Sequence, residues 1–72
     1  MSDFDPHYVF SHHSATPEKL ESYEAIHNAA KDFAQVILER VPNCADRDSV
    51  LHLLREASML ACSAISLDGR LK

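Results

Sequence analysis

The residues best suited to chemistry in this chain are two adjacent histidines in the sequence Phe10-Ser11-His12-His13. Adjacent imidazoles behind an aromatic side chain combine flat ring faces, hydrogen-bond donors and a charge that changes near neutral pH. These properties suit a ligand that carries both bases and phosphates. The sequence Thr16-Pro17 follows and is typical of a helix start, so the histidines lie where an N-terminal arm meets a helix.

A second candidate group consists of Tyr23, His27 and Lys31, which share one line of the predicted helix at positions i, i+4 and i+8. One interpretation is a boundary tyrosine that packs on a neighbouring helix beside a histidine whose hydrogen bonds are satisfied. The other is a groove in which a ring, an imidazole and an ammonium group stack on a base and bind a phosphate. The arm side chains that would close this groove are Tyr8, Phe10, His12 and His13.

Two amphipathic helices are predicted to position these side chains. Residues 1–15 show no sustained hydrophobic period and are interpreted as an extended N-terminal arm, and residues 16–72 as a helical hairpin domain. The first helix is expected over residues 17–41 and the second over residues 44–67. The short connection between them predicts an all-α fold, an antiparallel two-helix hairpin.

Local signals mark the ends of both helices. Pro42 should end the first helix, because the residue before a proline is disfavoured in the α region. Asn43 is the expected cap of the second helix. Asp68-Gly69 is expected to end that helix.

The apolar faces of the two predicted helices are wider than one partner helix can cover. Their packing stripes are Tyr23, Ile26, Ala30, Phe33 and Ile37 in the first helix, and Val50, Leu54, Ala57, Ala61 and Ala64 in the second. With the flanking apolar residues, each arc spans roughly 200°, against the ~100° that a single partner covers. We therefore expect a compact homo-oligomer whose stability depends on assembly.

Composition excludes several classes of protein. The formal net charge of −4 argues against a binder of duplex nucleic acid. No apolar run approaches the ~20 residues that span a membrane, and the acidic N-terminus does not resemble a secretion signal, so a cytoplasmic location is expected. Cys44 and Cys62 lie too far apart along one helix to form a disulfide there, which predicts free thiols.

Catalytic and metal-binding patterns are absent from the sequence. The five histidines and two cysteines form no C-x-x-C, H-E-x-x-H or H-x-x-x-H spacing. There is also no nucleophile elbow and no phosphate-binding glycine loop. We therefore expect a protein without enzymatic activity, metal centre or cofactor.

The order and spacing of short motifs nevertheless resemble a known family. The motifs are Phe10-Ser11-His12-His13, Thr16-Pro17, Tyr23-Glu24-Ala25-Ile26, Ala29-Ala30-Lys31, Phe33-Ala34, Ile37, Pro42, Glu56-Ala57-x-Met59, Ala61 and Ala64-Ile65. Together they resemble the small helical phage anti-CBASS proteins that sponge cyclic nucleotide signals, which are related to the hairpin domain of a Thoeris anti-defence sponge. The resemblance extends from about residue 10 to residue 67.

The resemblance implies a homohexamer of helical hairpins with ligand pockets between subunits. It implies cyclic oligonucleotide ligands, such as the cyclic dinucleotide 3′,3′-cGAMP, bound without cleavage in the cytoplasm of the infected host cell. In some members cyclic trinucleotides bind at a separate site. In this chain His12 would stack on a base and His27 and Lys31 would contact phosphate. The apolar and aromatic walls would be Tyr8, Phe10 and Tyr23.

The chain also departs from the family pattern. His12 replaces a stacking tyrosine, and His27 replaces an arginine or lysine. Leu60 and Cys62 stand where a tryptophan and an asparagine are common. The basic residue associated with trinucleotide binding has no counterpart at Leu67, and Arg70 is a displaced candidate.

Two alternatives remain open from the sequence. One is a protein–protein interaction module, in which the wide apolar faces bind another protein and the histidines are incidental. The other is a sponge for a messenger of the cyclic ADP-ribose type.

Overall fold

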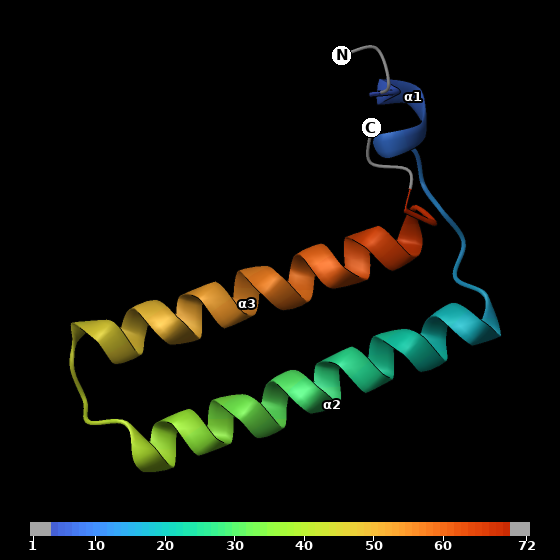
Figure 1. The fold of residues 1–72 in the computed structure, drawn as a ribbon. Coiled ribbons are helices and arrows are strands. Elements are labelled where there is room, and N and C mark those ends of the chain that lie inside the picture. Colours follow the sequence, from blue (N-terminus) through green and yellow to red (C-terminus); the bar gives the residue numbers. More distant parts are fainter. Residues whose placement is uncertain (1–3, 70–72) are drawn as a thin grey trace.

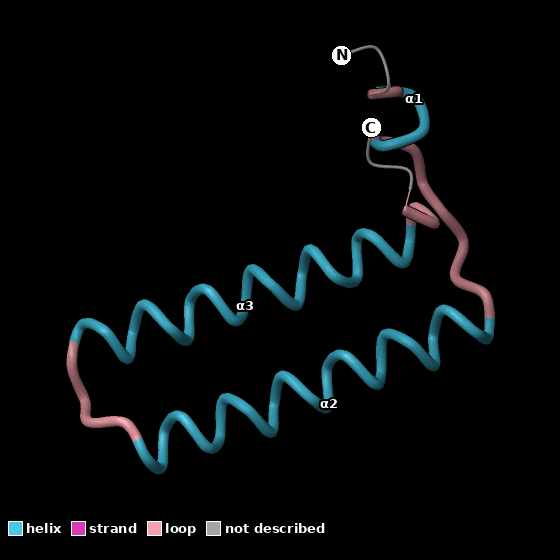
Figure 2. Tube along the Cα trace, in the orientation of Figure 1, coloured by secondary structure: helices cyan, strands magenta, loops and turns pink. Residues whose placement is uncertain are grey.

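The computed structural model describes residues 4–69, and in this range it consists of three helices without a strand (Figure 1). They are α1 (Pro6–Val9), α2 (Pro17–Arg40) and α3 (Ala45–Ser66). α2 and α3 lie side by side and antiparallel, joined at one end by a short loop, which confirms the all-α hairpin (Figure 2). α1 lies beyond the open end, close to the end of α3. Arg70 is outside the described residues.

The prediction of an extended arm over residues 1–15 is wrong at α1, where the chain forms a helical turn. Pro6 occupies the first helical position, and the Asp5 carboxylate accepts hydrogen bonds from the backbone N–H groups of His7 at 3.1 Å and Tyr8 at 3.4 Å. A single helical turn is too short to display a hydrophobic period. A capping carboxylate and a proline at the first helical position nevertheless favour such a turn.

The long helix α2 begins at the expected signal. The Thr16 hydroxyl accepts a hydrogen bond from the Lys19 N–H at 3.1 Å, and Pro17 occupies the first turn. The helix ends at Arg40, because Val41 is extended (φ −101°, ψ 131°) before Pro42.

The start of α3 differs from the prediction that Asn43 caps it. Cys44 is the N-cap residue, with extended backbone (φ −160°, ψ 173°), and its side chain forms no capping hydrogen bond. Asp46 and Asp48 in the first turn complement the positive end of the helix dipole instead.

At its other end α3 stops where the sequence predicts. Asp68 and Gly69 both have positive φ, 54° and 78°, and the Gly69 N–H donates to the carbonyl oxygen of Ala64 at 2.9 Å. This left-handed turn satisfies carbonyl groups at the helix end.

The contact between α2 and α3 is narrow. Only Ile37 and Leu67 are buried within residues 4–69. The predicted packing stripes are partly shifted: Phe33, Val50 and Ala57 are exposed, and half-buried positions on the same helices are Ala34, Leu51 and Ser58. Each apolar arc is about twice as wide as the arc that one partner helix covers. The pattern therefore does not specify which part of the arc faces that partner.

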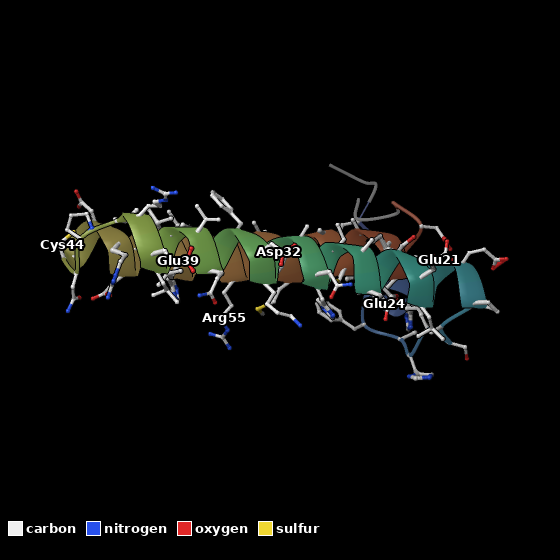
Figure 3. All side chains as sticks on the ribbon, turned by 90° about the horizontal axis from the view of Figure 1, so that it is seen from below. Glu21, Glu24, Asp32, Glu39, Cys44 and Arg55 are labelled. Carbon is white, nitrogen blue, oxygen red and sulfur yellow. The ribbon has the colours of Figure 1, made fainter. Side chains whose placement is uncertain are left out.

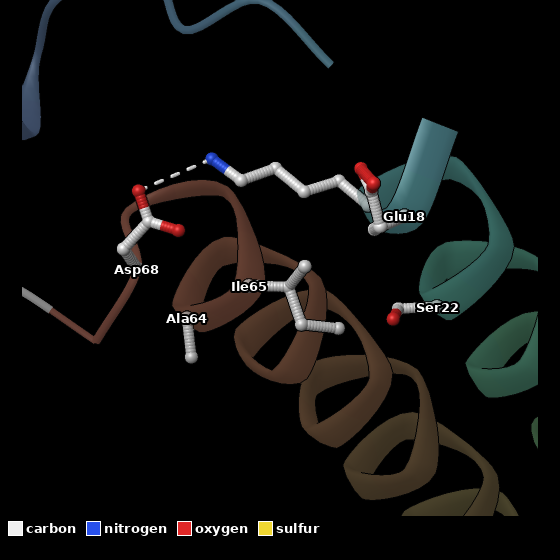
Figure 4. A pocket seen from close by; sticks show the side chains of 6 residues that line it. Glu18, Ser22, Ala64, Ile65 and Asp68 are labelled. Atoms are coloured by element: carbon white, nitrogen blue, oxygen red, sulfur yellow. Dashed lines mark hydrogen bonds and ion pairs between the residues drawn. The ribbon is translucent and has the colours of Figure 1, made fainter. Parts of the chain in front are cut away.

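The open end of the hairpin is held by side chains that bind the last carbonyls of α3. The Tyr8 hydroxyl donates to the carbonyl oxygen of Leu67 at 2.9 Å. The Lys19 ammonium donates to the carbonyl oxygen of Ser66 at 3.1 Å and pairs with the Asp68 carboxylate at 3.3 Å (Figure 4). Helix ends leave such carbonyls unpaired, so these contacts stabilise the end of α3 and attach the arm to it.

Replacing Tyr8 with phenylalanine is therefore expected to lower the free energy of unfolding by about 1 kcal/mol, the usual value of one such hydrogen bond. Urea denaturation followed by circular dichroism measures this change. Tyr23→Phe is the matched control, because the Tyr23 hydroxyl forms no hydrogen bond within the described chain. Equal effects of the two substitutions would show that the Tyr8 contact adds nothing to stability.

Candidate ligand-binding groove

One face of the hairpin carries a shallow groove of about 270 Å³ between α2 and α3. We call it the cationic groove; its lining residues are His27, Ala30, Lys31, Ala34, Leu51, Leu54, Arg55 and Ser58. The Arg55 side chain projects away from the helix pair, as Figure 3 shows. The groove thus joins residues from two helices that are distant in sequence.

The cationic side chains of the groove are available to a ligand. Lys31 lies one turn after His27 on α2, and Arg55 reaches the groove from α3. Neither Lys31 nor Arg55 forms an ion pair with any carboxylate in the described range. An unpaired ammonium and guanidinium group beside an imidazole can bind phosphate oxygens through charge-assisted hydrogen bonds.

The floor of the groove is apolar. Ala30 and Ala34 from α2 and Leu54 from α3 form it, and all are half-buried. The small alanine side chains leave space above the helix backbone. A flat, uncharged ring can pack on such a surface while its phosphates reach the surrounding cations.

His27 has a further partner in α3. Its Nε2 lies 3.6 Å from the Sγ of Cys62, a half-buried free thiol. This contact links the two helices next to the groove and orients the imidazole.

The arm does not cover the groove in the single chain. The Nε2–H of His13 donates to the carbonyl oxygen of Tyr8 at 2.6 Å, and the two rings form an edge contact with centroids 4.5 Å apart. Tyr8 is held at Leu67, which lies twelve residues after Arg55, or about 18 Å along a helix axis. The Tyr8–His13 pair therefore belongs to the open end of the hairpin.

The remaining predicted site residues are distributed as follows. His12 and Phe10 are exposed, Phe10 at 79% of its surface, and point to no partner in the groove. Tyr23 is half-buried and does not line the groove, which fits the interpretation as a boundary residue. The structure thus brings together His27 and Lys31 but not the arm residues.

Arg55 is the site residue that sequence reasoning missed. A signal was present, because Arg55 directly follows Leu54 and lies one turn after Leu51, at the edge of the apolar arc. Lys31 occupies the equivalent edge position on the first helix.

The opposite face of the hairpin is apolar. A second depression of about 250 Å³ is lined there by Ile26, Ala29, Ala30, Phe33, Leu54, Ala57, Ser58 and Ala61. Further exposed apolar side chains lie three, four or seven residues from Phe33 or Ala57, on the same side of each helix as this depression. They are Val36, Val50, Leu53 and Leu60. We call this surface the apolar face. Large apolar side chains gathered on one exposed surface are typical of an interaction site.

A third depression lies at the open end of the hairpin, near Glu18, Ser22 and Ile65 (Figure 4). Its one cation, Lys19, already pairs with Asp68. The carboxylates of Glu18 and Asp68 disfavour an anionic ligand there. The cationic groove is therefore the better phosphate site.

No group of three or more histidine, cysteine or acidic side chains in the described part of the chain is placed to hold a metal ion. No helix among those residues is long and apolar enough to cross a membrane.

These features define a small helical hairpin with unpaired cations beside an apolar groove. The sequence profile of the Acb2/Tad1 hairpin domain matches residues 5–66, and the chain belongs to this family. Its members are phage anti-defence sponges for cyclic nucleotides, so the resemblance drawn from the motifs is confirmed. Neither the curated proteins nor the solved structures contain a match to the chain.

Proposed function

We propose that this protein sequesters a cyclic oligonucleotide messenger, with cyclic dinucleotides such as 3′,3′-cGAMP as the leading candidates, and does not cleave it. The proposal rests on one observation: Lys31 and Arg55, neither of which forms an ion pair with a carboxylate in the described range, line one groove with an apolar floor. A cyclic dinucleotide combines two phosphates with two flat bases. Cations around an apolar surface complement both parts.

The groove is open in one chain, which supports binding between subunits. In the proposed complex Lys31, Arg55 and His27 contact phosphate, and a base lies on the alanines of α2. The exposed arm residues His12 and Phe10 then supply a stacking surface to the groove of a neighbouring copy. His13 and Tyr8 hold the arm in place for that contact.

The proposed active form is a homo-oligomer, a hexamer as the resemblance implies. Two buried side chains within residues 4–69 are too few to stabilise a hairpin of this size alone. Association through the apolar face removes Phe33 and its neighbours from water. The face and the cationic groove share Ala30, Leu54 and Ser58 where the two helices meet. The cations Lys31 and Arg55 line only the groove, so the proposed assembly leaves them accessible.

Sequestration without turnover follows from the chemistry of the groove. A guanidinium, an ammonium and an imidazole bind phosphate, and no carboxylate lines the groove with them. The Ser58 hydroxyl that lines it donates to the carbonyl oxygen of Arg55 at 2.9 Å, so it is not paired with a base. A sponge of this kind acts in the host cytoplasm, where it lowers the concentration of free messenger.

The test is calorimetric titration with 3′,3′-cGAMP, a cyclic ADP-ribose isomer and a linear dinucleotide, followed by heat denaturation and chromatography of the released ligand. We expect binding of the cyclic dinucleotide and its recovery intact. A linear product that accumulates with time would replace sequestration with catalysis. Binding of the cyclic ADP-ribose isomer alone would reassign the ligand class, and binding of none would favour an interaction module.

A further inference from the structure

A thiol and an imidazole meet beside the cationic groove, and the proposed function does not use the thiol. The Sγ of Cys62 on α3 lies 3.6 Å from the Nε2 of His27 on α2, a hydrogen-bond distance for sulfur. Cys62 is free and half-buried, whereas the His27 ring is exposed. A nucleophile and a base within hydrogen-bond reach are the arrangement that activates cysteine for attack.

The position of Cys62 connects it to the groove. It lies one turn after Ser58 and two turns after Arg55 on α3, and both of those residues line the groove. Its partner His27 is itself a lining residue. A group attached to the Cys62 sulfur therefore occupies the space beside His27 and displaces the imidazole from any phosphate.

The second cysteine provides an internal comparison. Cys44 is also free, but it is exposed at the N-cap of α3 and contacts no imidazole in the described structure. Exposure makes the Cys44 thiol accessible to a reagent without help from a histidine. The two thiols thus differ in accessibility and in whether an imidazole lies beside the sulfur.

We propose that Cys62 is a modification site for small disulfides, that His27 serves as its base, and that the modified protein has a blocked groove. In the reaction the imidazole Nε2 accepts the thiol proton while Sγ attacks one sulfur of the reagent. A new S–S bond forms to Cys62, and the S–S bond of the reagent breaks. The second sulfur leaves as a thiolate and takes up a proton, so the exchange is balanced without another oxidant.

The rate of modification tests the role of His27 without any nucleotide. Dithiobis-nitrobenzoate is the probe, because each exchange releases a coloured thiolate. Cys44→Ser protein reports Cys62, and Cys62→Ser protein reports Cys44. We expect His27→Gln to slow the reaction of Cys62 by about a hundredfold, the lower end of the range for a positioned base, and to leave the rate of Cys44 unchanged.

Two further measurements keep this test decisive if the substitution perturbs folding. In urea both thiols should react at rates that do not depend on residue 27. Lys31→Gln removes a neighbouring charge but keeps the thiol–imidazole pair, so it should slow Cys62 much less than His27→Gln does. Equal rates for Cys62 with and without His27 in the folded protein would overturn the proposal.

The effect on the groove rests on the proposed function and is measured separately. Modified Cys44→Ser protein should bind 3′,3′-cGAMP at least about tenfold more weakly than its reduced form, and a reducing agent should restore affinity. Modification of Cys62→Ser protein should leave affinity unchanged. Unchanged affinity after full modification of Cys62 would show that the thiol does not border the binding site. If the reduced protein binds no cyclic nucleotide, the proposed function fails while the rate measurement still decides the role of His27.

Discussion

Replacing Arg55 with glutamate is expected to lower the affinity for a cyclic dinucleotide by at least about a hundredfold, or about 2.7 kcal/mol. A hydrogen bond to a charged group contributes about 1.5–3 kcal/mol, and the introduced carboxylate also repels the phosphates. Arg55 has no carboxylate partner within residues 4–69, so its loss leaves no orphaned charge in the fold. Titration calorimetry with wild-type and variant protein measures the change.

Arg40→Glu is the matched control for this prediction. It makes the same change of charge on an exposed side chain in the last turn of α2, outside the cationic groove. We expect its affinity to remain within about threefold of the wild type, or ~0.6 kcal/mol. A similar loss in both variants would indicate that net charge governs binding and would remove the groove from the proposal.

Phe33→Glu is expected to dissociate the protein into smaller species at micromolar concentration and to lower its melting temperature. Phe33 is 55% exposed in the single chain and lines the depression of the apolar face. A carboxylate buried without a partner in the proposed interface costs several kcal/mol, which exceeds the gain from association of small apolar surfaces. Light scattering coupled to size-exclusion chromatography measures the mass.

Leu38→Glu is the control for the apolar face. Leu38 is 47% exposed, so the two substitutions introduce a charge at comparable exposure. It lies seven residues after Lys31 on α2, on the side of the cationic groove. We expect Leu38→Glu to retain the wild-type mass. A wild-type protein that is a folded monomer would contradict the proposed assembly regardless of either variant.

Sequence patterns were sufficient for the helices and for most of their ends. Thr16-Pro17 starts α2 and Asp68-Gly69 terminates α3 because capping and left-handed backbone are properties of a few adjacent residues. At Asp5-Pro6 the same capping chemistry forms a helical turn without any hydrophobic period. Family membership was also predictable, because it depends on the order of motifs along the chain.

The composition of the groove depended on tertiary structure. His27 and Lys31 were identified because they lie on one helix face, where spacing alone makes them neighbours. Arg55 and Cys62 join them only through the pairing of α3 with α2. The apolar arc of each helix is wider than the part that its partner covers. Several rotations of α3 about its own axis would therefore bury apolar residues, and each would place different side chains beside α2. The amino-acid sequence by itself therefore determined the hairpin, whereas only the packing of the two helices decided which residues share a site.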